Sequence, residues 1–133
     1  MKSLKWGAEY NIGIKEIDSQ HEEFVNIINK LCWAEEHSFP IEIGVRLVYE
    51  LIKYAEFHFT CEENMMFLYK YGRLSSQIEE HKKLLGIMQM KMNEFKNGSI
   101  GYDAVSKFAF MWLISHTVEE DKKFGDFMKS KVV

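Results

Sequence analysis

The sequence predicts an all-α protein, an antiparallel up-down four-helix bundle with an ordered N-terminal arm. Of its 133 residues, 47% are apolar, and only one Pro and eight Gly interrupt them, which favours packed helices over a disordered or linker-like chain. Apolar side chains recur at helical spacing in four segments separated by turn signals. Short connections make consecutive helices antiparallel neighbours. We therefore expect a single domain over residues 1–133.

The arm and the first helix are separated by a polar pair. Residues 1–17 carry scattered aromatic and β-branched side chains, which predict a segment packed on the bundle. Asp18 or Ser19 can cap the free N–H groups of a helix over 18–37. That helix ends before Pro40, because proline disfavours helix in the residue before it.

The second helix is expected over 41–69. Pro40 is a natural start, since its missing N–H costs little in a first helical turn. The segment is apolar on more than one side, which predicts deep burial. Gly72 is expected to end it.

The third and fourth helices follow. Ser76 and Glu79 form a capping box that predicts a helix over 76–96. Gly98 ends this helix, because glycine readily takes the left-handed conformation after a helix. A last apolar stripe predicts a helix over 102–128.

Charge and cysteine content exclude several classes of protein. The 17 basic and 20 acidic residues give a net charge of −3, without the basic stripe of a nucleic-acid binder. Two cysteines outside any Cys-x-x-Cys motif do not make a disulfide framework. The sequence shows no signal-peptide pattern and no apolar run of about 20 residues that could span a bilayer. We expect a cytoplasmic monomer with no membrane partner.

Polar residues on the apolar helix faces carry the functional information. His58 and Glu62 stand four apart and share a face. A carboxylate among apolar neighbours is costly unless it is paired or bound to a metal. Taken alone, this pair is more typical of a hydrogen-bonded surface pair than of a metal site.

One histidine falls near the apolar stripe of every predicted helix: His21, His58, His81 and His116. Asp121 follows His116 by five residues, which on a regular α-helix turns its side chain roughly 140° away. The two converge only if the helix is distorted, as π-bulges at functional sites allow. Four imidazoles with two carboxylates, Glu62 and Asp121, suit a two-metal centre with ions about 3.5–4 Å apart.

Four motifs make the chain resemble the hemerythrin family, and within it the single-domain bacteriohemerythrins. They are 17–21 (IDSQH), 58–63 (HFTCEE), 71–81 and 112–121 (WLISHTVEED), together with Trp6. The resemblance covers essentially the whole chain. It implies a non-haem centre of two Fe ions, with a bridging oxo or hydroxo group, that binds dioxygen reversibly.

The resemblance also implies the role of each residue. His21 and His58 match the histidines of the five-coordinate iron, where dioxygen binds. Glu62 and Asp121 match the bridging carboxylates. On the other, coordinatively full iron, two of three histidines are matched, by His81 and His116. The expected oxygen pocket is lined by Phe24, Phe59, Trp112, Leu113 and Thr117.

Gln77 departs from the family pattern, because it stands where a third histidine of the full iron is expected. Three alternatives are open. The amide oxygen ligates iron, although it is a weaker donor than imidazole; or Gln77 turns away and leaves an open position; or the site holds metal poorly, even a single ion. We prefer the second to the first, since an open position lets a ligand bridge both metals.

Thr117 is the second departure, at a position where the family usually has an apolar residue. Its hydroxyl either reaches the oxygen pocket, which predicts faster autoxidation, or bonds a backbone carbonyl one turn back.

The leading hypothesis is a dioxygen-binding di-iron protein for storage, delivery or sensing rather than an enzyme. One alternative is a di-iron oxidase or peroxidase, or a nitric-oxide-reactive protein, motivated by Gln77 and Thr117. The other is a metal-poor helical interaction module.

Overall fold

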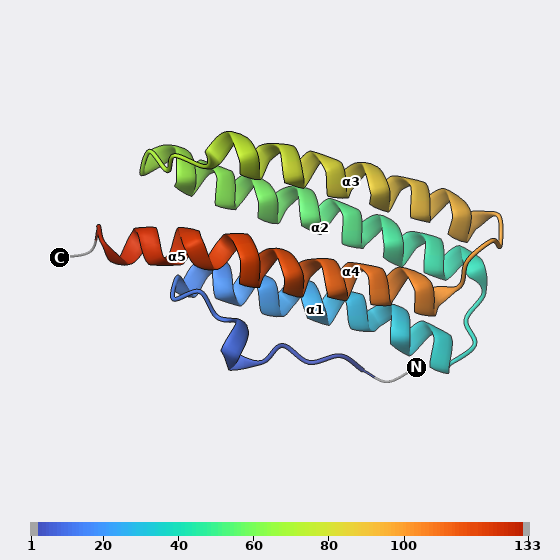
Figure 1. The fold of residues 1–133 in the computed structure, drawn as a ribbon. Helices are drawn as coiled ribbons and strands as arrows, with labels where there is room; N and C mark the ends of the chain where they lie inside the picture. Colours follow the sequence, from blue (N-terminus) through green and yellow to red (C-terminus); the bar gives the residue numbers. More distant parts are fainter. Residues whose placement is uncertain (1–2, 132–133) are drawn as a thin grey trace.

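The predicted four-helix bundle is confirmed. A computed structural model describes residues 3–131, in which the long helices are α1 (Lys15–Glu36), α2 (Ile41–Leu68), α3 (Leu74–Lys96) and α4 (Tyr102–His116). A five-residue π-helical stretch, Thr117–Asp121, joins α4 to α5 (Lys122–Lys129). Together these three elements form the last rod of the bundle (Figure 1). The arm precedes α1, contains one short 3-10 turn (Ala8–Tyr10), and runs along the outside of the helices.

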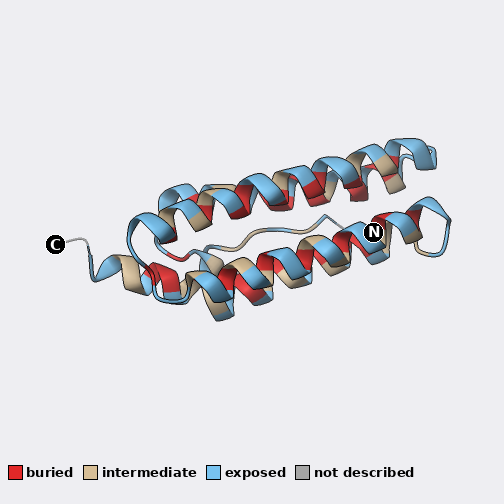
Figure 2. Cartoon of the chain, turned by 90° about the horizontal axis from the view of Figure 1, so that it is seen from above, coloured by how far each residue is buried: buried red, intermediate tan, exposed pale blue. Residues whose placement is uncertain are grey.

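The helices pack in a ring, since α1 contacts α2, α2 contacts α3, α3 contacts α4, and α4 contacts α1. Their buried stripes face the centre of the bundle (Figure 2). Burial of each large side chain there contributes roughly 1.5–3 kcal/mol, and the best buried include Ile28, Leu31, Leu51, Val105 and Leu113. None of the helices within residues 3–131 is long and apolar enough to cross a membrane.

The start of the first helix differs from the prediction. The α1 helix begins at Lys15, and its N-cap residue, Ile14, makes no side-chain cap. The carboxylate of Asp18 instead accepts hydrogen bonds from the backbone N–H groups of Ile12 (2.7 Å) and Gly13 (3.1 Å). Its acceptors are therefore used to hold the arm, so the arm ends at residue 14 rather than 17.

The start of the third helix also differs. The α3 helix begins at Leu74, two residues before the predicted start, and Arg73 occupies the N-cap without a side-chain bond. The predicted capping box of Ser76 and Glu79 is therefore wrong, because both residues already lie within the helix.

The turn between α2 and α3 depends on Lys70 rather than on Gly72. After Leu68, the left-handed residue is Lys70, with φ of 56°. The N–H of Tyr71 then donates to the carbonyl of Met66 at 2.9 Å, which turns the chain back onto the helix end. The corresponding prediction at the end of α3 is confirmed, because Gly98 has φ of 81°.

The arm crosses α5 at a point where only glycine fits. A Cβ added to Gly125 would lie 2.1 Å from the carbonyl oxygen of Ile12. Ile12 is itself only 3% exposed. The backbone of the arm therefore contacts the backbone of the last rod directly.

We predict that Gly125→Ala lowers the free energy of unfolding by about 2 kcal/mol or more, because the new methyl group must displace the arm backbone. Chemical denaturation measures this change. The matched control is Gly86→Ala on α3, where an added Cβ meets nothing within 4 Å. The free energy of unfolding of that control should rise by up to about 1 kcal/mol, because alanine favours a helix interior more than glycine does. Equal stability of the two variants would contradict the close contact.

Candidate metal centre

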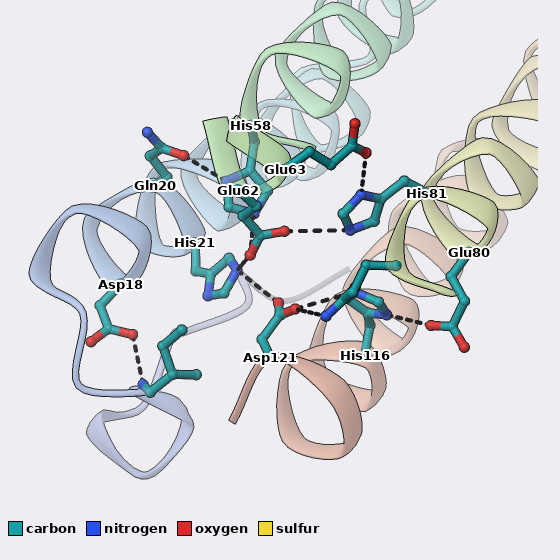
Figure 3. A network of polar contacts seen from close by, with 12 residues as sticks. Asp18, Gln20, His21, His58, Glu62, Glu63, Glu80, His81, His116 and Asp121 are labelled. Atoms are coloured by element: carbon teal, nitrogen blue, oxygen red, sulfur yellow. Dashed lines mark hydrogen bonds and ion pairs between the residues drawn. The ribbon is translucent and has the colours of Figure 1, made fainter. Parts of the chain in front are cut away.

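Six buried polar side chains meet inside one end of the bundle (Figure 3). His21 comes from α1, His58 and Glu62 from α2, and His81 from α3. His116 ends α4 and Asp121 ends the π-helical stretch. None of the six is more than 5% exposed. All six residues singled out from the sequence are thus brought together.

Glu62 lies between three of the histidines. Its Oε2 is 3.4 Å from Nε2 of His21 and 3.5 Å from Nε2 of His58. Its Oε1 is 3.4 Å from Nε2 of His81. The two carboxylate oxygens therefore face different histidines. We call His21 and His58 the first half of the site, and His81 and His116 the second half.

Asp121 spans the two halves in the same way. Its Oδ2 is 3.3 Å from Nε2 of His21, and its Oδ1 is 3.2 Å from Nε2 of His116. The π-helical stretch Thr117–Asp121 makes this possible, because hydrogen bonds between residues five apart bring such residues back to the same face. The local distortion that convergence of His116 and Asp121 requires is therefore present.

Three of the histidines are oriented from outside the site. Nδ1 of His58 lies 2.7 Å from Oε1 of Gln20. Nδ1 of His81 lies 2.7 Å from Glu63, and Nδ1 of His116 lies 2.9 Å from Glu80; these outer partners are drawn in Figure 3.

These outer partners determine which ring nitrogen faces the site. An amide oxygen and a carboxylate only accept, so Nδ1 of each ring carries the proton. In a neutral imidazole, Nε2 then presents a lone pair towards the other residues of the site. The arrangement therefore aims three lone pairs at Glu62 and Asp121, as metal ligands require.

The inward atoms fit cations. All four Nε2 atoms, both oxygens of Glu62 and Oδ2 of Asp121 are buried, and no hydrogen-bond partner is found for them among the described residues. Lone pairs on nitrogen and on carboxylate oxygen repel at 3.2–3.5 Å unless a proton or metal ion lies between them. Imidazole and carboxylate are suitable ligands for iron, zinc and copper.

Two positions for such a cation share Glu62. One group of donors is His21, His58 and Glu62, and the other is Glu62, His81 and His116. Within each group, the candidate ligand atoms lie within 4.8 Å of one another. The site therefore has the donors of a dinuclear centre, with one half on each side of the shared carboxylates.

Burial and charge shift the pKa values in the direction expected when positive charge is needed. Burial lowers the pKa of His21, but contact with Asp121 and Glu62 outweighs it and raises the value to about 9. Burial also lowers the pKa of His116, but the contact with Asp121, together with the charges of the nearby carboxylates, outweighs burial and raises this pKa above its usual value. Burial raises the pKa of Glu62, yet the neighbouring His58 and the other imidazoles hold it well below its usual range. Two buried anions thus favour bound cations.

Gln77 lies against this centre and is 2% exposed. Its Nε2 donates to Oδ1 of Asp121 at 3.2 Å. Its Oε1 is buried, with no partner among the described residues. The amide thus contacts Asp121 through its donor, and each half is left with two imidazoles.

The predicted pocket residues lie against the rings of the site. Phe24 meets His58 edge-on, with ring centroids 6.0 Å apart. Phe59 stacks on His81 at 3.9 Å, and Trp112 stacks on His116 at 4.5 Å. Leu113 is 1% exposed in the main core. The surroundings of the centre are therefore apolar.

Thr117, the first residue of the π-helical stretch, is fully buried, and its Oγ1 has no hydrogen-bond partner in the described part of the chain. The alternative in which this hydroxyl bonds a backbone carbonyl is therefore wrong. In the core, a small cavity of about 10 Å³ is lined only by apolar side chains: Phe24, Leu51, Ala55, Leu84, Met88 and Ala109. Apolar cavities of this kind remain dry.

The sequence indicated all six inward residues but missed their outer partners Gln20, Glu63 and Glu80. Each of these three reaches a histidine on another helix. Such a contact depends on the register between two helices, which the spacing within one helix does not predict. Their one signal was proximity, because each is adjacent in sequence to a candidate ligand.

A helical bundle that buries histidines and carboxylates around shared positions for cations defines a class of helical metal-binding proteins. The family model described as "Hemerythrin HHE cation binding domain" matches residues 12–127. The chain belongs to the hemerythrin family.

Comparisons with individual proteins agree with this assignment. A bacteriohemerythrin of Clostridium acetobutylicum is 28% identical, over 91% of this chain and 98% of that protein. A bacteriohemerythrin of Methylococcus capsulatus is 29% identical, over 94% of this chain and 96% of that protein. A crystal structure of wild-type hemerythrin superposes with a TM-score of 0.81 at 25% identity, over 94% of this chain and 97% of that chain.

We predict that the metal-free protein loses stability as the pH rises from 6.5 to 9. Below pH 6.5, His21 is protonated in both the folded and the unfolded chain, so its favourable contacts contribute fully. Above the folded pKa of about 9 this contribution, on the order of 3 kcal/mol, is lost. Chemical denaturation at several pH values measures how the free energy of unfolding changes with pH.

The control for this prediction is His37→Gln, which changes an exposed histidine at the end of α1. This variant should show the same pH dependence of the free energy of unfolding as the metal-free protein. Saturating metal should remove that pH dependence. A metal-free protein whose stability stays flat between pH 6.5 and 9 would contradict the assigned pairing.

Proposed function

We propose that this protein is a non-haem di-iron dioxygen-binding protein, used for storage, delivery or sensing. The observation that carries the proposal is the convergence of four imidazoles on two shared, buried carboxylates whose inward atoms have no hydrogen-bond partner among the described residues. The proposed cofactor is two Fe ions with a bridging oxo or hydroxo group. Such a centre supplies the electrons and the open coordination position that reversible dioxygen binding requires.

Each residue of the site has a part in holding this centre. His21 and His58 would hold one iron, and His81 and His116 the other. Glu62 and Asp121 would each offer one oxygen to each half, as their contacts with both halves support. Gln20, Glu63 and Glu80 fix the rings so that Nε2 faces inward.

The apolar residues around the centre exclude water. Phe24, Phe59 and Trp112 cover three of the imidazoles, and Leu113 closes the core beside them. A dry environment strengthens the electrostatic contacts inside it and limits proton entry, which favours release of dioxygen over its reduction. This supports a carrier or sensor.

Gln77 is proposed to act as a hydrogen-bond donor to Asp121 rather than as a ligand. Its Nε2 contact with Oδ1 and the ligand count of the second half support this. The second half then lacks the third histidine that the family places there. A position for an external ligand is therefore available on both halves.

A di-iron oxidase or peroxidase, or a nitric-oxide-reactive protein, is the second candidate function. Two observations favour it, namely the missing third imidazole at Gln77 and the buried, unpartnered hydroxyl of Thr117. Both would promote reduction of a bound oxygen species, by admitting a bridging ligand and by offering a proton donor.

Metal analysis followed by exposure to dioxygen tests these functions. Two irons per chain and a visible charge-transfer band that disappears when dioxygen is removed support a carrier or sensor. Immediate conversion to the oxidised form, with peroxide released or consumed, supports the enzyme. A purified protein that binds no iron would leave only the helical interaction module.

We predict that Gln77→His prolongs the lifetime of the oxygenated protein by about tenfold, because an imidazole fills the position of the second half. Autoxidation after mixing the reduced protein with dioxygen gives this rate. Gln77→Ala separates the effects, since it removes the bond to Asp121 without adding a ligand and should not lengthen the lifetime. Equal lifetimes of Gln77→His and the unaltered protein would contradict the open position.

We predict that Thr117→Val slows autoxidation about 2- to 10-fold, the range expected for loss of one hydrogen bond to a bound oxygen species. The same visible band measures the rate. Thr60→Val is the matched control, since the hydroxyl of Thr60 is exposed on α2 and donates to the carbonyl of Glu56. A similar change in both variants would show that Thr117 acts through stability alone.

A further inference from the structure

The two halves of the site differ in the charge of their outer partners. In the first half, His58 donates to the neutral amide oxygen of Gln20. Nδ1 of His21 has no hydrogen-bond partner among the described residues, and the ring of Trp6 lies 5.2 Å from its ring. No carboxylate therefore contacts an outward nitrogen of the first half in the described part of the chain.

In the second half, both outward nitrogens contact carboxylates. Glu63 lies 2.7 Å from Nδ1 of His81, and Glu80 lies 2.9 Å from Nδ1 of His116. In Figure 3, Glu63 lies above the ring of His81, and Glu80 lies to the right of the ring of His116. Because the inward carboxylates are shared, the outer acids make the second half more negative by two formal charges.

An imidazole that donates to a carboxylate is a stronger ligand than one that donates to an amide. The acceptor's negative charge raises the basicity of the ring, and therefore the electron density at Nε2. The charge also attracts the bound cation directly. Both effects are stronger on the half in which the acids lie, since Glu63 and Glu80 each contact a ring of the second half.

We propose that Glu63 and Glu80 compensate for the missing third histidine, and that they make the second half the tighter of the two metal positions. This inference rests on the proposed dinuclear centre and adds an order of loading to it. By ligand count alone, with Gln77 turned to Asp121, each half has two imidazoles and the same shared acids. The charges of Glu63 and Glu80 make the metal affinities of the two halves unequal.

The placement of the two acids suits this role. Glu80 is 46% and Glu63 is 26% exposed, so neither carboxylate requires a buried counter-ion when metal is absent. Glu80 and His116 also line one surface pocket of about 330 Å³, together with Lys83 and Trp112. Neutral substitutions at Glu63 and Glu80 should therefore leave the fold intact.

The test is anaerobic titration of the metal-free protein with ferrous iron against a chromophoric chelator. The unaltered chain should bind one ion more tightly than the other. Glu63→Gln and Glu80→Gln should each weaken the tighter step about tenfold, because glutamine still accepts the hydrogen bond but carries no charge. The reverse change, Gln20→Glu, should raise the affinity for the more weakly bound ion. The difference between the two affinities should therefore become smaller.

Two controls separate charge from structure. Glu79→Gln neutralises an exposed acid next to Glu80 and should leave both steps unchanged. Glu80→Ala removes charge and hydrogen bond together. If Glu80→Ala weakens binding while Glu80→Gln does not, Glu80 only orients His116, and the proposal is overturned. Two steps unchanged in both Glu63→Gln and Glu80→Gln would also overturn it.

The half that responds is identified by disabling one half at a time. In a His58→Ala background the remaining ion lies in the second half, so Glu80→Gln should weaken its binding about tenfold. In a His116→Ala background, Glu80 has lost its partner, so Glu80→Gln should have a much smaller effect on the affinity for the remaining ion. If either background fails to fold by circular dichroism, the two-step titration of the single-charge variants decides alone.

This outcome is independent of the reaction with dioxygen. A chain that binds two ions with the predicted order but never binds dioxygen reversibly refutes the proposed carrier function and retains the inference. A chain that binds dioxygen reversibly, but whose two iron affinities do not depend on Glu63 and Glu80, refutes the inference and retains the proposed carrier function.

Discussion

Two carboxylates and four imidazoles buried at one end of an apolar bundle are the constraint on which the rest of this structure depends. An uncompensated buried carboxylate costs several kcal/mol, far more than one well-packed apolar side chain returns. Glu62 is fully buried and Asp121 is 1% exposed, so both need positive charge close by. Contact with Asp121 and Glu62 raises the pKa of His21, so a proton on this ring compensates the carboxylates where no other cation is bound. Metal binding then replaces a positive charge that the fold already requires.

This constraint explains the irregular part of the last rod. A regular α-helix would turn Asp121 away from His116 and leave its carboxylate in the apolar core or in solvent. The π-helical stretch restores the contact, with Oδ1 of Asp121 3.2 Å from Nε2 of His116. Such a stretch carries poorer backbone hydrogen bonding than an α-helix. The bridging contact of Asp121 is what compensates for it.

The sequence predicted the parts of the fold and site that depend on local pattern. Helical periodicity gave four helices, and polar residues on apolar faces gave all six inward side chains. The spacing of His116 and Asp121 showed only that the two side chains converge if the helix is distorted between them. What failed were the capping roles of Asp18 and Ser76, because a residue that could cap a helix was used elsewhere or lay inside it. The outer partners were missed because Glu63 belongs to α2 but contacts His81 of α3.

The wrong assignment of Asp18 bears on the site itself. By accepting from the N–H groups of Ile12 and Gly13, Asp18 bends the arm back along α1. Trp6 of the returning arm then packs over His21, with ring centroids 5.2 Å apart. His21 is the one inward histidine held by packing alone on its outer side, since its Nδ1 meets no hydrogen-bond acceptor in the described residues. In the first half, His21 therefore depends on the packing of the arm and His58 on the amide of Gln20. In the second half, carboxylates orient both rings.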